Sequence, residues 1–222
     1  IADIKRTVND FKQAALNAFE AGFDGVELHS ANGYLLQQFL HKNSNHRTDE
    51  YGGSIENRAR IIFEILDELK TVVDLSRVGI RFNPALHGMM GIEVDDETTD
   101  LYNYVISRLN DYPLAYIHLT EPFTDVSKVD LAIKEVAKHF RKLYKGTIIT
   151  NVRYTKETAN QVISSGDADL VAFGTLYIAN PDLVERFKVD APLNTPDKNT
   201  YYTPGEKGYT DYPKMNESNK SI

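Results

Sequence analysis

Apolar side chains recur along the chain in two spacings that alternate with each other. A spacing of three or four residues predicts amphipathic helices, and short runs of Val, Ile and Leu predict buried strands. A helix predicted over residues 9–21 comes first and ends at Gly22. The predicted strands contain Val26 to Leu28, Val78 to Phe82, Tyr116 to Leu119, Thr147 to Thr150 and Leu170 to Phe173.

Helical patterns separate the predicted strands. A short apolar turn at residues 35–40 and a polar loop at 43–53 precede a helix with Ser54 as its N-cap. We expect four later helices. The first begins at Asp95 or Asp96, and the second carries the apolar residues Leu131 to Leu143. The third has Thr155 as its N-cap, and the fourth begins at Pro181.

This alternation predicts an α/β protein with a parallel sheet. A doubly wound sheet would normally carry a G-x-G-x-x-G turn after its first strand, and no such motif occurs here. A TIM (β/α)8 barrel is therefore favoured. Since such a barrel needs eight strands, about three of its units are absent from the predicted elements.

The composition narrows the classes of function. The chain has 222 residues, of which 41% are hydrophobic, and a net charge of −7. The acidic balance and the lack of a Lys/Arg run argue against nucleic-acid binding, and no apolar run is long enough to span a membrane. No cysteine is present for a disulfide or a thiolate. We therefore expect a cytoplasmic protein that acts on a small molecule.

Polar side chains cluster where the first predicted strand ends. His29, Asn32 and Tyr34 offer an imidazole, an amide and a phenol within six residues. Such a set can hold a polar acceptor and deliver a proton, and parallel α/β sheets place their sites at strand ends. A role for the same residues in capping and packing is equally compatible with the pattern.

Other charged groups are interpreted as structural. Arg47, Asp49, Glu56 and Arg58 are predicted to form an ion-pair network that braces the polar loop. No carboxylate partner suitable for a metal site accompanies the remaining histidines, so we expect no metal and a structural role for His41, His46, His87, His118 and His139.

Longer motifs are spread over nearly all of the chain. They are residues 29–34 (HSANGY), 45–58 (NHRTDEYGGSIENR), 79–81 (GIR), 168–174 (ADLVAFG), 178–183 (IANPDL) and 208–213 (GYTDYP). In these motifs the sequence resembles the old yellow enzyme family of flavin-dependent ene-reductases.

The resemblance implies a TIM barrel that holds FMN at its C-terminal mouth, with this chain supplying the last five βα units. In the family, residues matching His29 and Asn32 hydrogen-bond the oxygen of the substrate, and the residue matching Tyr34 protonates the adjacent carbon. Arg81 matches an arginine beneath the flavin, and Tyr202 matches a segment that places an aromatic ring over the substrate. NAD(P)H is the implied hydride source.

Two loops depart from the family pattern. Family members usually carry Asn-Gly-Gly after the seventh strand and Gly-Arg after the eighth, where backbone amides and the arginine hold the FMN phosphate. This chain has Asn151-Val152-Arg153 and Gly174-Thr175. We expect the loss of glycine to remove access to positive φ, and the loss of arginine to remove a charged contact. Arg153 is a candidate replacement for that arginine.

Three functions stay open on these observations. The favoured one is an ene-reductase that transfers hydride from NAD(P)H through FMN to an enone or nitro compound. The others are a non-catalytic barrel with a binding or structural role, and an enzyme that works without flavin. Because the implied early strands carry other flavin contacts, we expect either the missing N-terminal barrel segment or a homo-oligomer to be needed.

The domain organisation predicted is one barrel portion followed by a tail. Residues 1–189 are assigned to the C-terminal part of the barrel domain. From residue 190 to residue 222 Pro, Asn, Thr, Lys and Tyr dominate and apolar periodicity ends. We interpret this stretch as a polar extension, with its tyrosines indicating some docking.

Overall fold

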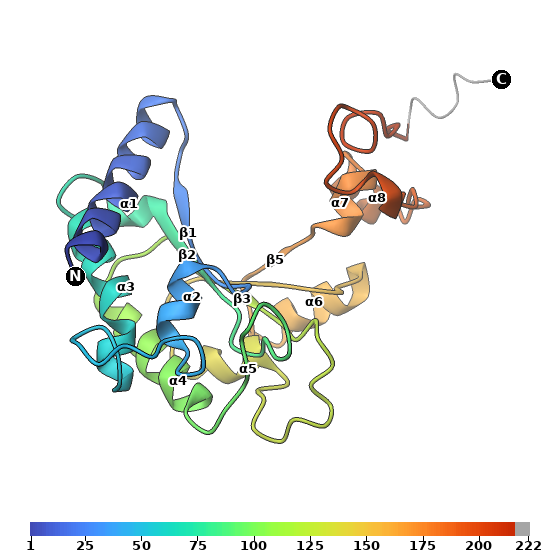
Figure 1. Cartoon of the computed structure of the whole chain (residues 1–222). Helices are drawn as coiled ribbons and strands as arrows, with labels where there is room; N and C mark the ends of the chain where they lie inside the picture. Colours follow the sequence, from blue (N-terminus) through green and yellow to red (C-terminus); the bar gives the residue numbers. More distant parts are fainter. Residues whose placement is uncertain (216–222) are drawn as a thin grey trace.

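Five parallel strands form one sheet whose spatial order equals their order in the chain (Figure 1). The computed structural model describes residues 1–215. The strands are β1 (Val26–Ser30), β2 (Val78–Phe82), β3 (Tyr116–Thr120), β4 (Ile148–Asn151) and β5 (Leu170–Ala172). Residues 216–222, the end of the predicted extension, lie outside the described residues.

Helices connect the strands in every interval. The α-helices are α1 (Ala2–Glu20), α2 (Leu35–Leu40), α3 (Ile55–Leu69), α4 (Thr98–Arg108), α5 (Val136–Arg141), α6 (Lys156–Ser164), α7 (Thr175–Ala179) and α8 (Leu183–Lys188). Short 3-10 turns are η1 (Leu75–Arg77), η2 (Leu109–Asp111) and η3 (Lys198–Thr200). The prediction of βα units from a barrel is therefore confirmed in strand direction, order and alternation.

The two faces of the sheet differ in polarity. Because side chains alternate along a strand, one face carries apolar residues that pack against the helices. Val78, Ile80 and Phe82 of β2 are fully buried there, and the core continues through Leu66 of α3 and Tyr102 of α4. The opposite face carries charged and polar side chains, so any chemistry of the sheet lies on that face.

Helix α3 follows the predicted local signals closely. The Ser54 side chain accepts a hydrogen bond from the backbone N–H of Asn57, and Glu56 stands in the first turn, where a negative charge is favourable. Thr155 likewise caps α6 within a capping box. These local rules place the two helices without help from the rest of the fold.

Other boundaries differ from the sequence prediction. The first helix begins at Ala2 rather than residue 9. Asp95 does not cap α4 directly; its carboxylate accepts from the N–H of Glu97 in the turn before the helix. The apolar pattern from Leu131 does not form a helix until Val136, and Leu131 is 55% exposed. That stretch is a loop in which Leu131 faces solvent, while Ala132 is buried and Ile133 packs against the core.

The predicted extension docks on the last two helices. The Arg186 guanidinium of α8 donates to the carbonyl oxygens of Pro192 and Pro213, and the Asp182 carboxylate accepts from the N–H of Met215. Figure 1 shows this segment gathered around α7 and α8, beyond the end of β5. The Tyr212 hydroxyl accepts from the N–H of Asp197 within the extension itself, so docking by the tyrosines stays a prediction.

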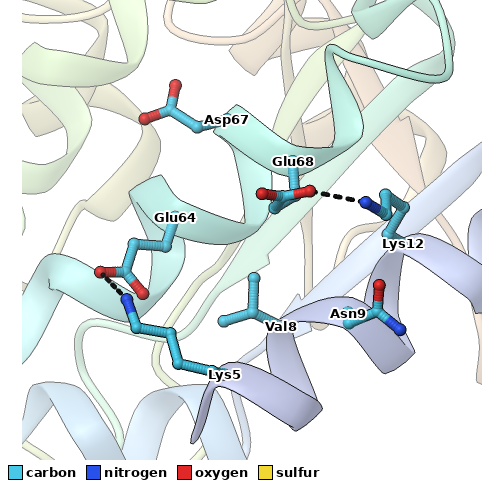
Figure 2. A pocket seen from close by; sticks show the side chains of 7 residues that line it. All are labelled: Lys5, Val8, Asn9, Lys12, Glu64, Asp67 and Glu68. Carbon is cyan, nitrogen blue, oxygen red and sulfur yellow. Dashed lines mark hydrogen bonds and ion pairs between the residues drawn. The ribbon is translucent and has the colours of Figure 1, made fainter.

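A groove of about 400 Å³ lies between α1 and α3, on the helical side of the molecule (Figure 2). Lys5 binds Glu64 at 3.1 Å and Lys12 binds Glu68 at 2.7 Å across it. Its charges are thus paired with each other, and it lies on the face of the sheet opposite His29. The groove is a helix contact and offers no chemistry.

Candidate active site

His29 stands near the carboxyl end of β1 on the polar face of the sheet. Its Cα is the register partner of Arg81 in β2, so the two side chains lie at the same level. The backbone N–H of Ala31 donates to His29 Nδ1 at 3.2 Å. Because a backbone N–H cannot accept, the neutral ring carries its proton on Nε2. His29 therefore presents one N–H donor away from its own loop.

The protonation state of His29 follows from its surroundings. Partial burial lowers the pKa of the imidazole, the positive Arg81 lowers it further, and Glu27 opposes both effects. The ring is consequently neutral at neutral pH. A neutral ring donates a hydrogen bond to a polar ligand without supplying a strong acid.

Asn32 lies in the turn after β1, in the left-handed region with φ of 56°. Asparagine tolerates this region better than most residues. Its Oδ1 accepts a hydrogen bond of 2.9 Å from Nδ2 of Asn83, which directly follows β2. Since the amide oxygen is occupied, the Nδ2 group of Asn32 is the half that can donate to a ligand.

Tyr34 lies beside His29 and stays accessible. The two rings meet edge to face at a centroid distance of 5.0 Å, and Tyr34 is 55% exposed. The structure thus brings together His29, Asn32 and Tyr34 as the sequence predicts them, with a phenol next to two N–H donors. The set can bind an acceptor oxygen and supply a proton near it.

A row of polar side chains crosses the same face from β1 to β4. Arg81 Nε donates to Thr120 Oγ1 at 3.3 Å, and its guanidinium forms no ion pair within residues 1–215. His118 lies 2.9 Å from Glu27 Oε2 through Nδ1 and 3.0 Å from Asn151 Nδ2 through Nε2. A fixed cation and a fixed histidine therefore stand at the centre of the sheet.

Glu27 and His118 form an ion-pair geometry that the sequence prediction missed. Burial favours the protonated form of Glu27, but the hydrogen bonds from His118 and Tyr116 and the positive charge of Arg81 together hold the pKa of Glu27 below its ordinary value. Strand periodicity contains the missing signal, because Glu27 and His29 differ by two residues and share a face. His118 can be placed in the site only from the strand register, in which it is the Cα partner of Arg81.

A buried chain of hydrogen bonds supports the loop that carries Asn32 and Tyr34. Gln37 Oε1 accepts from the N–H of Gly33, and Gln37 Nε2 donates to the Tyr102 oxygen. His41 Nδ1 can only donate to the carbonyl oxygen of Glu93, so its Nε2 accepts from the Tyr102 hydroxyl. Each of these hydrogen bonds has a determined donor and acceptor, and the buried side chains hold the loop in place.

We expect His41 to make stability depend on acidity. Burial lowers its pKa from 6.5 to about 4. The unfolded chain then binds a proton at His41 more readily than the folded protein does. The contribution of neutral His41 to stability is therefore complete above pH 6.5 and is lost as the pH falls towards 4. The loss amounts to about 3 kcal/mol. Urea unfolding across this range should show a steeper decline for the wild type than for His41→Gln; equal slopes would contradict the expectation.

The loop after β4 corrects one prediction. Val152 has φ of 87° and Arg153 has φ of 58°, so the loop takes positive φ although glycine is absent. This conformation is unfavourable for a β-branched residue. The expectation that losing glycine removes positive φ is wrong, because both residues adopt it with side chains present.

Relief of this strain gives a second prediction. Val152→Gly is expected to raise the free energy of unfolding by about 1 kcal/mol, since glycine adopts positive φ without a Cβ clash and loses part of that gain to unfolded-state entropy. Denaturant unfolding measures the change. Val72→Gly is the matched control, at a position without positive φ, and should destabilise. A destabilised Val152→Gly would show that Val152 is not strained.

The remaining predicted site residues lie farther along the chain. Gly174 and Thr175 follow β5, whose Ala172 pairs with Asn151, so the two loops are neighbours at the carboxyl edge. Arg153 Nη2 donates to the carbonyl of Phe123 at 3.0 Å. Tyr202 is 98% exposed in the docked extension, and the structure does not bring it to His29. Its role over a substrate stays a prediction.

Comparison with known proteins places this geometry in a family. The model of the NADH:flavin oxidoreductase / NADH oxidase family matches residues 1–194. The chain belongs to that family. FMN and a nicotinamide nucleotide are the cofactors of the old yellow enzyme type to which its relatives belong, and the resemblance predicted from the motifs is confirmed.

Individual relatives agree in sequence and fold. Putative 12-oxophytodienoate reductase 5 of Oryza sativa subsp. japonica is 47% identical over 100% of this chain and 60% of its own length. A probable flavin mononucleotide-dependent alkene reductase of Leishmania infantum is 45% identical over 96% and 56%. The chain therefore spans less than two thirds of the relatives it matches.

Solved structures give the same correspondence. A morphinone reductase in complex with tetrahydroNAD superposes with a TM-score of 0.89 at 40% identity, covering 100% of this chain and 59% of that one. The old yellow enzyme homologue from Zymomonas mobilis gives a TM-score of 0.89 at 36% identity, covering 96% and 59%. The prediction of a partial TIM barrel of this family is confirmed.

The residues present fit the polar groups of FMN. Asn151 Oδ1 is buried and has no hydrogen-bond partner within the described chain, so it can accept from the N–H of a bound ring. Arg81 has guanidinium N–H groups to spare, and consecutive positive φ values at Val152 and Arg153 turn the backbone sharply where β4 ends.

Across residues 1–215, none of the helices combines the length and apolarity needed to cross a bilayer.

Proposed function

We propose that the protein is an FMN-dependent reductase of activated alkenes, with Tyr34 as the proton donor. The observation that supports this most strongly is the grouping of His29 Nε2–H, the Asn32 amide and the Tyr34 hydroxyl at one strand end. The names of two relatives, a 12-oxophytodienoate reductase and an alkene reductase, point to the same class of substrate.

Each residue has a distinct part in the proposed reaction. When bound, FMN supplies the hydride, which it obtains from NAD(P)H. His29 and Asn32 donate hydrogen bonds to the carbonyl or nitro oxygen of the substrate, where negative charge develops as hydride reaches the β-carbon. Tyr34 gives its phenolic proton to the α-carbon, which balances the charge and completes the saturated product.

The proposed FMN-binding residues are those at the carboxyl ends of β2, β4 and β5. Arg81 places a positive charge on the face shared with His29, and such a charge favours an anionic form of the reduced ring. Asn151 offers its free amide oxygen. Val152, Arg153, Gly174 and Thr175 form the neighbouring loops, which we assign to the phosphate end.

Arg153 gives a test of the phosphate assignment. If it replaces the arginine expected at Thr175, Arg153→Ala should weaken FMN binding by about tenfold, because an arginine contact with a dianion is charge-assisted. The guanidinium is exposed and, within residues 1–215, bonds only the Phe123 carbonyl, so it can turn without breaking an ion pair there. Equilibrium dialysis with FMN measures the change. Unchanged affinity would remove Arg153 from the site.

The proposal includes strands from outside the described sheet, because both edges of this sheet are unpaired. Within the described residues β1 and β5 each pair on one side only, and edges of a parallel sheet are normally covered. We infer that strands from an N-terminal barrel segment or from another copy complete the cofactor site. Size-exclusion chromatography with mass measurement separates these: a stable monomer that retains FMN contradicts the need for any partner strand.

A binding protein without flavin is the second candidate, favoured by the absence of the arginine at Thr175. Visible absorption after FMN addition and desalting decides between the two. The experiment uses this chain and a version extended at its N-terminus. A retained flavin band that bleaches with NADH and returns with 2-cyclohexen-1-one supports the reductase. Absence of flavin from both proteins contradicts it and favours the binding protein.

A further inference from the structure

Asn83 is a fully buried residue at the point where the two loops of the site meet. It directly follows β2, and Pro84 restricts its backbone to the extended region. The Gln37 side chain donates to the Asn83 carbonyl oxygen at 2.8 Å and accepts from the N–H of Gly33 at 2.8 Å. One side chain thus ties the loop after β1 to the loop after β2.

The Asn83 side chain reaches from this fixed backbone to Asn32. Its Nδ2 donates to Asn32 Oδ1 at 2.9 Å, while its own Oδ1 is buried and has no partner in the described part of the chain. A buried acceptor without a donor is unfavourable. The arrangement nevertheless keeps the donor half of Asn83 towards Asn32.

We propose that Asn83 is a positioning residue that turns the Asn32 amide so that its N–H group, and not its oxygen, faces the substrate. An amide has one acceptor end and one donor end, and the two exchange places when the group rotates by half a turn. Asn83 occupies the acceptor end of Asn32. The donor end then faces the same side as His29 Nε2–H, which gives two donors for one substrate oxygen.

This orientation suits the substrates of the proposed function. Two neutral N–H donors favour a ligand that presents an acceptor oxygen, such as a ketone, an aldehyde or a nitro group. They discriminate against a ligand that presents only a donor at that point, because Asn32 and His29 would then lose their partners. This inference rests on the proposed function for its substrate, but the amide orientation itself does not.

Asn83→Asp is the sharpest variant because a carboxylate only accepts hydrogen bonds. The Asn32 amide must then rotate, donate Nδ2–H to the new carboxylate and turn its oxygen towards the substrate. Side-chain amide resonances of Asn32 in ¹⁵N-labelled protein should shift and exchange more slowly with solvent than in the wild type. An unmoved Asn32 resonance overturns the proposal whether or not the protein is active.

A double-mutant cycle supplies the functional readout with Asn83→Leu and Asn32→Ala. The probe is 2-cyclohexen-1-one, titrated into the FMN-supplemented protein. Asn83→Leu should weaken its binding by about tenfold when Asn32 is present and by less than about twofold in the Asn32→Ala background. Equal weakening in both backgrounds would assign Asn83 a structural role and overturn the proposal.

Asn45→Asp is the matched control. Asn45 is another buried asparagine, and its Nδ2 donates to the carbonyl oxygens of Phe39 and Tyr51, away from Asn32. We expect this variant to lose stability while the Asn32 resonance stays in place. A wild type that binds no enone but shows the Asn32 shift in Asn83→Asp would contradict the proposed function and support the positioning role, so the two failures are distinguishable.

Discussion

Tyr34→Phe is expected to lower turnover of an activated alkene by about 100-fold to 10,000-fold, which is the usual contribution of a general acid. The change removes one hydroxyl and keeps the ring that meets His29 edge to face. Binding of the alkene should therefore change little, because the two N–H donors of His29 and Asn32 are retained. The loss should appear in kcat and not in KM.

The measurement is steady-state reduction of 2-cyclohexen-1-one with NADH, in the form of the protein that retains FMN. Oxidation of NADH by oxygen, which needs no proton transfer to carbon, should stay at the wild-type rate. Tyr209→Phe, at a partly exposed tyrosine of the docked extension, is the control. Full alkene turnover in Tyr34→Phe would show that the proton comes from another donor.

Arg58→Met is expected to lower the free energy of unfolding by about 4 kcal/mol, because charged hydrogen bonds within the fold are lost together. Arg58 is 2% exposed although it is charged. Its guanidinium donates to the carbonyls of Leu40 and Gly53 and to Glu97 Oε2. It thereby joins α3 to the end of α2 and to the start of α4.

Urea unfolding followed by circular dichroism measures this effect. Arg47→Met is the matched control, because the exposed Arg47 pairs with Asp49 within the same loop and solvent screens such a pair, so it contributes little to stability. Similar losses in both variants would contradict the structural distinction between them. The predicted ion-pair network is therefore confirmed only for Arg47 and Asp49: within residues 1–215 Arg58 pairs with Glu97 instead, and Glu56 forms no ion pair.

Local sequence signals predicted most of the scaffold. Strand β2 has the bounds expected from its apolar run, and the N-caps Ser54 and Thr155 stand where capping chemistry requires them. These features depend on neighbours within a few residues, so the order of side chains is sufficient. The helix predicted from Leu131 is confirmed only from Val136 to Arg141, where Val136 and Phe140 are buried as the periodicity predicts, and the stretch before it is a loop with Leu131 exposed.

The candidate site likewise has residues that the sequence predicted and residues that only the structure revealed. His29, Asn32 and Tyr34 lie within six residues, and the sequence alone brought them together. Glu27 lies within β1, His118 lies within β3 and Asn83 directly follows β2. Only the pairing of the strands places His118 beside Arg81 and Asn83 beside Asn32. No local pattern encodes such contacts between distant segments.

The sequence by itself thus determined the succession of βα units, the family and the chemical groups available at the end of β1. Tertiary structure decided their protonation and orientation. The neutral His29 depends on burial and on the charge of Arg81, and the direction of the Asn32 amide depends on Asn83. Electrostatic environment and amide direction arise from groups far apart in the chain, because they act through space.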